Sequence, residues 1–355
     1  MQRIRPSIVL AVTTMAVLAA APRTAAFRAQ ATRLEYRVVY AQARSLESAL
    51  NDAGRDGFAC AVVARTEPGF GAPGVAVIAT RVAGAPIAPV PHHVFVGGGG
   101  ELGEPLTRAG ADGDRLCGLT FIEDSSRPAV VAVTRRDTDP SARWQYSLDV
   151  LRDFKPALAR INDAARAGAR PVATAQVNDN RVPAMRSWVV AMERPAAGAL
   201  PGEVVVRSAP GPDGLTKALN EQGRQGYEAN LFWREGETVV AMMTRAPGGP
   251  TTFEYLAESR APSAFHFTNG LYLADFPYLS DGDRLVVTNR RVSGSAEIVA
   301  DPLPPLGGAG VPRIGTLLPL GDHLTSFHNA VPVSALILRA GTGPFVLRTV
   351  VAERR

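Results

Sequence analysis

Two distant segments of this chain carry the same pattern at what reads as the end of a helix. Residues 46–58 and 215–227 are identical at seven of thirteen positions, and Phe58 is matched by another aromatic residue, Tyr227. Such a dense match at identical spacing indicates an internal repeat, which restricts the fold more than length does. The identical pairs are Leu46 and Leu215, Ala49 and Ala218, Leu50 and Leu219, Asn51 and Asn220, Gly54 and Gly223, Arg55 and Arg224, and Gly57 and Gly226.

The clearer copy, residues 203–246, predicts a strand, a helix and two further strands. A Val-rich run is followed by Asp213, which we expect to be the helix N-cap. Gly223 and Gly226 are typical of a helix end at which glycine adopts a left-handed backbone. Two strand-like segments joined by a turn complete the unit.

Weaker copies of this unit cover most of the chain, so the sequence predicts an α+β protein of six tandem β-α-β-β repeats. A unit of about 45 residues is too small to bury a sufficient core alone. The repeats should therefore share cores, either as face-to-face pairs, which we prefer, or as a pseudosymmetric ring. We expect them at residues 32–82, 92–136, 143–194, 203–246, 252–292 and 314–355, with a Pro- and Gly-rich linker at 293–313.

The third strand of every copy ends in a polar residue followed by arginine. Upstream of the arginine both strand faces are apolar, as in 239–243, which is typical of a sheet covered on both sides. If the strand ends converge, the arginines would line one rim and suit carboxylate or phosphate groups. If the strands run out into solvent, the arginines only mark their ends. They are Arg81, Arg135, Arg194, Arg245, Arg290 and Arg354.

Each unit also resembles a small bacterial domain of unknown function. That domain opens with a Tyr-Lys-Val strand and ends its helix in Leu-Asn-x-x-Gly-x-x-Gly-aromatic. The matching residues here are 36–38 with 50–58 in the first unit and 219–227 in the fourth. The resemblance covers these two units and implies a fold, with no activity attached.

The first 31 residues predict an export signal that is removed from the mature protein. Arg3 and Arg5 precede an apolar stretch of about 15 residues, shorter than the roughly 20 that a membrane span needs, and small residues follow. Removal of residues 1–31 leaves 34 basic against 33 acidic residues, a net charge of +1. We find no clustered basic face of the kind that binds nucleic acid. The sequence therefore predicts a periplasmic or extracellular protein with no transmembrane segment in its mature chain.

Export would place the two cysteines, Cys60 and Cys117, in an oxidising compartment. Both lie early in the second strand of adjacent units, 14 and 15 residues after Leu46 and Leu102. Equivalent positions of paired units can meet, which favours a disulfide bond between them. The one-residue offset argues against the bond, because it could turn the thiols to opposite sheet faces. The alternative is two buried small apolar side chains.

Motifs for catalysis, metals and cofactors are weak in this sequence. Gly98, Gly100 and Gly103 match a dinucleotide fingerprint, but Pro105 and an early helix end favour a loop, and we expect no cofactor. The few histidines lack metal-ligand or catalytic-triad spacing, so we assign no catalytic or metal residue. Asp-Gly-Asp-Arg-Leu recurs at 112–116 and 281–285, where turn formation is favoured over calcium binding.

These observations favour a non-catalytic exported repeat protein that binds a small anionic ligand or a protein partner. One alternative is an exported hydrolase whose site lies between repeats, for example at Asp322, His323 and His328. A second is an envelope binder of anions or glycans that uses the arginine rim. It would add the aromatic residues Phe265, Phe267, Tyr272, Phe276 and Tyr278, for which the core of the fifth unit is the competing interpretation.

Overall fold

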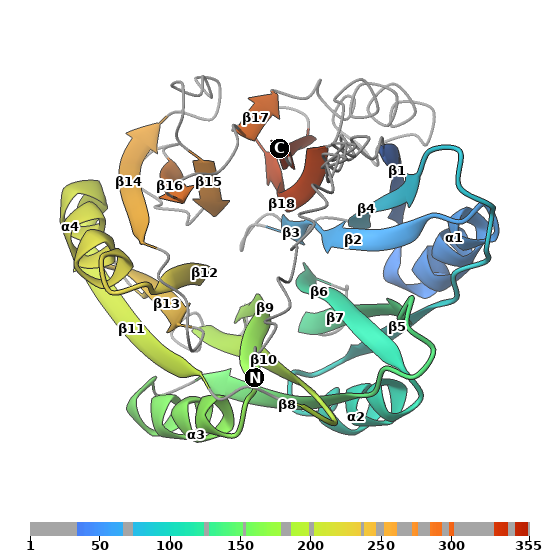
Figure 1. Cartoon of the computed structure of the whole chain (residues 1–355), viewed down its shortest axis with the longest axis horizontal. Helices are drawn as coiled ribbons and strands as arrows, with labels where there is room; N and C mark the ends of the chain where they lie inside the picture. The colour runs from blue at the N-terminus through green and yellow to red at the C-terminus, as the bar shows by residue number, and fades with distance from the viewer. Residues whose placement is uncertain are drawn as a thin grey trace, which may run out of the picture. The chain divides into compact units, whose positions relative to one another are not determined.

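A computed structural model of the protein places its described residues in a mixed α+β arrangement of small antiparallel sheets (Figure 1). The structure describes residues 34–66, 74–123, 128–151, 154–178, 186–198, 202–235, 238–245, 252–260, 272–275, 285–292, 298–301, 330–339 and 345–353.

Four groups of elements follow the predicted order of strand, helix, strand and strand. They are β1 (Leu34–Ala41), α1 (Ala43–Arg55), β2 (Ala59–Val63) and β4 (Val75–Val82); β5 (His92–Gly97), α2 (Gly103–Ala111), β6 (Asp114–Glu123) and β7 (Pro128–Arg136); β8 (Trp144–Leu151), α3 (Phe154–Arg166), β9 (Arg170–Asn178) and β10 (Arg186–Pro195); and β11 (Glu203–Pro210), α4 (Gly211–Gly223), β12 (Glu228–Glu235) and β13 (Thr238–Arg245).

Two more sheets follow along the chain, built from strands alone among the residues that the structure describes. One contains β14 (Phe253–Arg260), β15 (Tyr272–Asp275) and β16 (Leu285–Val292), and the other β17 (Ile298–Asp301), β18 (Ala330–Arg339) and β19 (Phe345–Glu353). A short extra strand, β3 (Arg65–Thr66), pairs in parallel with β18.

All six sheets have the same strand order, in which the third strand lies between the first and the second. Each second strand is also interrupted by a register shift near its start, as expected for a β-bulge. The shifts lie between Cys60 and Val62, Leu116 and Gly118, Pro171 and Ala173, Ala229 and Leu231, Leu273 and Asp275, and Pro332 and Ser334.

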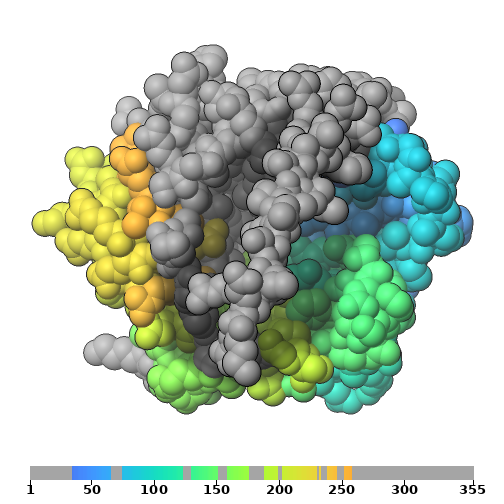
Figure 2. All heavy atoms as spheres, viewed as in Figure 1, coloured from blue at the N-terminus to red at the C-terminus, as the bar shows by residue number. Residues whose placement is uncertain are grey.

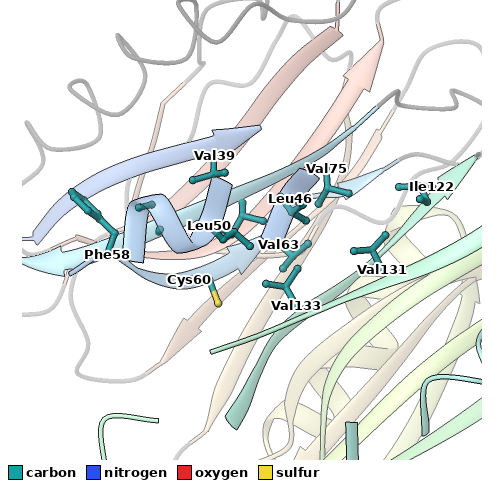
Figure 3. Close-up of a cluster of buried hydrophobic side chains, with 13 residues drawn as sticks. Val39, Leu46, Leu50, Phe58, Cys60, Val63, Val75, Ile122, Val131 and Val133 are labelled. Carbon is teal, nitrogen blue, oxygen red and sulfur yellow. The ribbon is translucent and has the colours of Figure 1, made fainter. Parts of the chain in front are cut away.

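Residues on the central strands alternate between two cores, which explains why these strands are apolar on both faces. Val131 and Val133 of β7 pack with Val63 and Leu46 of the first group (Figure 3), whereas Val130 belongs to the core shared with the third group. Strand β10 alternates in the same way between the cores on its two sides. Each of the four helices thus covers its own sheet and also meets residues of the next.

This packing makes the preference for face-to-face pairs wrong. Paired units would give each sheet one shared core, but the sheets centred on β7 and β10 each share a core with both of their neighbours in the chain. The physical reason is the period-2 alternation of a strand, which presents two apolar faces when every position is apolar.

Glycines near the helix ends serve two different purposes. Gly57 and Gly226 have left-handed φ values of 81° and 84°, as predicted. Gly54 and Gly223 allow a close approach instead, because an added Cβ would lie 2.1 Å from the Val90 carbonyl oxygen and 2.2 Å from that of Phe253, respectively. The first strand of the following group therefore runs directly against the preceding helix.

Two local expectations need correction. Helix α4 begins at Gly211 with Pro210 as its N-cap residue, so Asp213 lies in the first turn, where its charge still complements the helix dipole. Asp213 is exposed, and α4 lies at the molecular surface (Figure 2). Strand β17, at Ile298–Asp301, falls inside the segment expected to be a linker. Its short apolar run is too brief to stand out from the Pro- and Gly-rich sequence around it.

Candidate functional site

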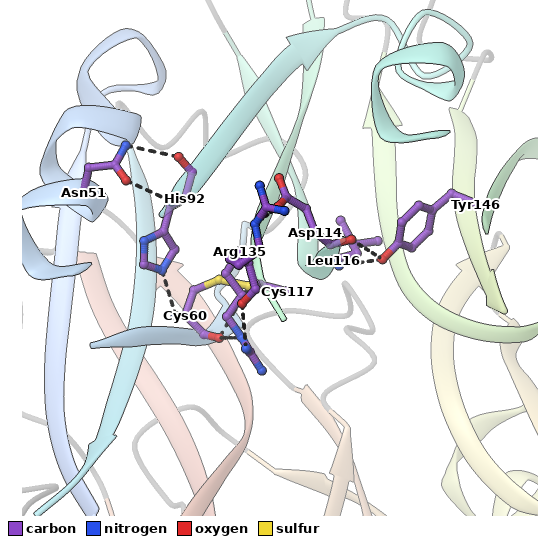
Figure 4. Close-up of a disulfide and its surroundings, with 9 residues drawn as sticks. Asn51, Cys60, His92, Asp114, Leu116, Cys117, Arg135 and Tyr146 are labelled. Carbon is purple, nitrogen blue, oxygen red and sulfur yellow. Dashed lines mark hydrogen bonds and ion pairs between the residues drawn. A yellow bond between two sulfur atoms is a disulfide. The ribbon is translucent and has the colours of Figure 1, made fainter. Parts of the chain in front are cut away.

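The predicted disulfide bond joins Cys60 of β2 to Cys117 of β6, with their Cα atoms 6.0 Å apart (Figure 4). The one-residue offset that argued against the bond is explained by the bulges. Cys60 precedes the register shift in β2, whereas Cys117 is itself the extra residue in β6. A bulge re-aims one side chain, so the two sulfur atoms meet across neighbouring sheets.

Beside the disulfide, His92 of β5 is completely buried and connects the same two sheets. Its Nε2 accepts a hydrogen bond of 3.0 Å from the Cys60 backbone N–H. Asn51 of α1 pairs with the His92 backbone, donating to its carbonyl at 3.1 Å and accepting from its N–H at 2.8 Å. Burial lowers the pKa of His92 to about 4, and the nearby Arg135 guanidinium acts in the same direction. The ring is therefore neutral at physiological pH.

The same contact recurs at two other junctions, and we call it the ring bridge. The hydroxyl of Tyr146 in β8 accepts from the Leu116 N–H at 2.8 Å, and that of Tyr255 in β14 accepts from the Ala229 N–H at 2.7 Å. In all three cases the donor immediately precedes the bulge of the preceding sheet. The bridge thus supplies an acceptor for a backbone donor at a point where the strand ladder is irregular.

The remaining junction among the four helical groups has neither a donor nor an acceptor at these positions. Pro171, which has no N–H, precedes the bulge of β9. The buried Val204 lies where His92 does at the first junction. Two residues before His92, the Val90 N–H donates to the Gly54 carbonyl. Two residues before Val204, the Gly202 N–H donates in the same way to the Ala165 carbonyl. This junction therefore has an apolar pair, Pro171 and Val204, where the other three have a polar pair.

Three of the arginines predicted for the rim contact groups of their own units. Arg81, Arg194 and Arg245 end their strands on the face that carries the unit's own helix and bind local groups. Arg81 contacts Glu35 and the Asp56 carbonyl, and lies over the Phe58 ring. Arg194 contacts Gln145 and the Ala167 carbonyl, while Arg245 contacts Glu203 and lies over Tyr227.

Arg135 differs from these three because it lies on the opposite face of its strand. Its Nε donates to the Cys60 carbonyl at 3.1 Å, in the preceding sheet. The equivalent of Arg81 is the next residue, Arg136, whose NH1 donates to the carbonyl of Asp112 at the end of α2. Arg290 lies in β16, where it pairs with Tyr255 of β14, and Arg354 lies outside the described residues.

Two buried carboxylates bind basic side chains, and the sequence analysis assigned neither of them to a site. Asp114 contacts His93 at 2.6 Å and Arg136 at 3.1 Å. Glu193, on β10, is 1% exposed and contacts Arg115 at 3.3 Å, Arg170 at 3.2 Å and the Tyr146 hydroxyl at 3.2 Å. Glu193 is the polar residue that precedes Arg194 in the strand-end motif. The sequence analysis found this motif but assigned a possible role to its arginine alone.

Other candidates lie beyond what the structure describes. Asp322, His323 and His328 are outside the described residues, as are Phe265, Phe267, Phe276 and Tyr278, while Tyr272 lies in β15. Within the described ranges, no three His, Cys, Asp or Glu side chains are placed to hold a metal ion. Among the helices described, none is long and apolar enough to cross a membrane.

No protein-family model, curated protein or solved structure matches this chain.

Proposed function

We propose that this protein is an exported, non-catalytic scaffold of six related β-α-β-β units that binds a ligand or a protein partner. The shared strand order and the six bulges at matching positions support the repeat interpretation.

The proposal includes a cyclic order of packing, in which each sheet contacts the next and the last contacts the first. Contacts between second strands support this order, since β6 lies against β2 and β9, and β12 against β9 and β15. At the ends of the chain, β18 contacts β2 and pairs with β3. A chain closed in this way presents the ends of its strands together, which suits a binding platform.

The observation that carries the proposal is the use of polar side chains at the unit junctions. His92, Tyr146 and Tyr255 are all committed to holding neighbouring sheets in place. Such residues build a rigid support, and binding groups are commonly placed on the exposed ends of a support of this kind. The Cys60–Cys117 bond is compatible with export, because disulfides persist in oxidising compartments.

A ligand screen with recovery of the ligand tests this function. The protein, purified after export, would be screened by thermal shift against anions, glycans and nucleotides, and each hit would be recovered and weighed by mass spectrometry. Binding at a hundred times the dissociation constant adds about 2.7 kcal/mol. A stabilising ligand that is recovered unchanged supports the scaffold, whereas conversion of the ligand to a product would refute it. An N-terminus at residue 32 in the exported fraction would support export.

A further inference from the structure

A second group of arginines, which shares only Arg135 with the predicted rim, gathers where β6, β7 and β9 meet. Arg115 of β6 is paired directly opposite Arg135 of β7, and Arg170 of β9 is paired directly opposite Glu193 of β10. Glu193 in turn contacts both Arg115 and Arg170 through a single carboxylate oxygen, Oε1. The three guanidinium groups are therefore tied to one another through strand pairing and one buried acid.

This arrangement brings like charges together, at a cost that a bound anion would offset. Like charges directly opposite each other on neighbouring strands destabilise a sheet. The contacts to Glu193 are 3.2–3.4 Å long, whereas ion-paired hydrogen bonds in proteins are usually about 2.7–2.9 Å. One acid thus holds two arginines loosely, and each guanidinium has five N–H donors, more than these contacts use.

The charges near the cluster leave a positive surplus. Glu193 and Asp137 are the two carboxylates that act on Arg135, while Arg115 repels it. Asp137 is also engaged by the indole N–H of Trp144 at 3.0 Å. Three guanidinium groups against two carboxylates leave one positive charge. Arg170 is 58% exposed and Arg115 is 33% exposed, so the cluster is open to solvent.

We propose that Arg115, Arg135 and Arg170 form a binding site for the oxyanion of a small molecule, a carboxylate or a phosphate. Guanidinium groups match both anions with paired hydrogen bonds. The Trp144 ring, 4.4 Å below the Arg115 guanidinium, and the buried Glu193 hold the arginines in position before the anion arrives. This inference rests on the proposed binding function and gives it a ligand class and a location.

Calorimetric titration of the exported protein with inorganic phosphate and with citrate, at constant ionic strength, tests this site. Arg170→Gln and Arg115→Gln should each weaken binding roughly tenfold or more, because each removes charged hydrogen bonds to the anion. Arg108→Gln is the matched control, since this arginine is 73% exposed on α2 and pairs only with Glu104 among the described residues. It should bind as the unchanged protein does.

Tighter binding of phosphate or of citrate would decide which oxyanion the site takes, and either result supports the proposal. Absence of saturable binding of both anions would overturn it, as would binding that Arg170→Gln and Arg115→Gln leave unchanged. Circular dichroism of each variant would establish that it is folded. The scaffold proposal would survive such a failure if another ligand bound and was recovered unchanged, so the two ideas fail separately.

Discussion

Replacing Gly54 by alanine tests whether close contact between a helix and the next strand holds the units together. An added Cβ would lie 2.1 Å from the Val90 carbonyl oxygen, and ordinary van der Waals contact begins at 3.4 Å. The segment carrying Val90, which leads into β5, must therefore move by roughly 1 Å. Moving it also disturbs the paired hydrogen bonds between Asn51 and His92, which lie in the same contact.

The expected loss follows from three contributions. Overpacking of this kind costs about 1–3 kcal/mol. Two weakened hydrogen bonds add about 1 kcal/mol each. Alanine is a better helix former than glycine by about 1 kcal/mol, which opposes the loss. Gly54→Ala should therefore destabilise the protein by about 2–4 kcal/mol, and Gly223→Ala, whose Cβ would lie 2.2 Å from the Phe253 carbonyl, should behave alike.

Denaturant unfolding measures this loss as a lower midpoint at an unchanged slope. Gly103→Ala is the control, because this glycine opens α2 and has nothing within 4 Å of an added Cβ. Its stability should stay within about 0.5 kcal/mol of the unchanged protein. If Gly54→Ala proved as stable as Gly103→Ala, the close contact would not hold the junction, and the reasoning would be refuted.

Three further predictions concern the same junctions. The pKa of His92 is about 4 in the folded protein and about 6.5 in the unfolded chain, so the unfolded state binds more protons between these pH values. The free energy of unfolding should therefore fall by about 3 kcal/mol as the pH drops from about 6.5 to 4. His92→Tyr, which introduces the residue found in the other two ring bridges, should remove that part of the pH dependence. Urea unfolding at pH 7 and 4.5 measures it, and a stability difference between the two pH values equal to that of the unchanged protein would contradict the prediction. The double variant Cys60→Ala with Cys117→Ala should lose up to about 4 kcal/mol, because the bond closes a loop of 57 residues; equal midpoints would exclude a stabilising bond. Asn220→Ala should cost about 2 kcal/mol through its two lost bonds to the Tyr255 backbone, whereas Lys217→Ala, exposed on the same helix, should have little effect on the midpoint.

Much of the fold was accessible from the sequence because its signals are local. Runs such as 239–243 predicted sheets covered on both faces, and the alternating cores confirm this. The matching places of the two cysteines in adjacent units favoured the Cys60–Cys117 bond and their one-residue offset argued against it; the bond is present. Glycine spacing predicted the helix ends, although Gly54 and Gly223 owe their places to contact with the next strand, a role that no single unit can reveal.

The candidate site was less accessible because it depends on sheet face and on contacts between units. The sequence motif at the strand end matched Arg135 to Arg81. In the structure, Arg136 is the residue whose side chain lies on the same face of its strand as that of Arg81. A one-residue shift reverses the face of a strand, so a cluster inferred from an end motif is easily misplaced. The Arg115–Arg170–Glu193 contacts join residues up to 78 positions apart, beyond the reach of any local pattern.

The ring bridge shows how the same backbone contact can be made by different side chains. Each of these junctions has an acceptor atom opposite the N–H that precedes a bulge. The acceptor is a histidine nitrogen at one junction and a tyrosine oxygen at two others. Where Pro171 removes the donor, an unmatched buried acceptor would carry a desolvation cost, and Val204 avoids it. Residue identity at one position therefore depends on a residue more than thirty positions away. Units under such paired constraints can differ in sequence while these backbone contacts stay the same. Among the three ring bridges, we expect the one held by histidine to be sensitive to acid.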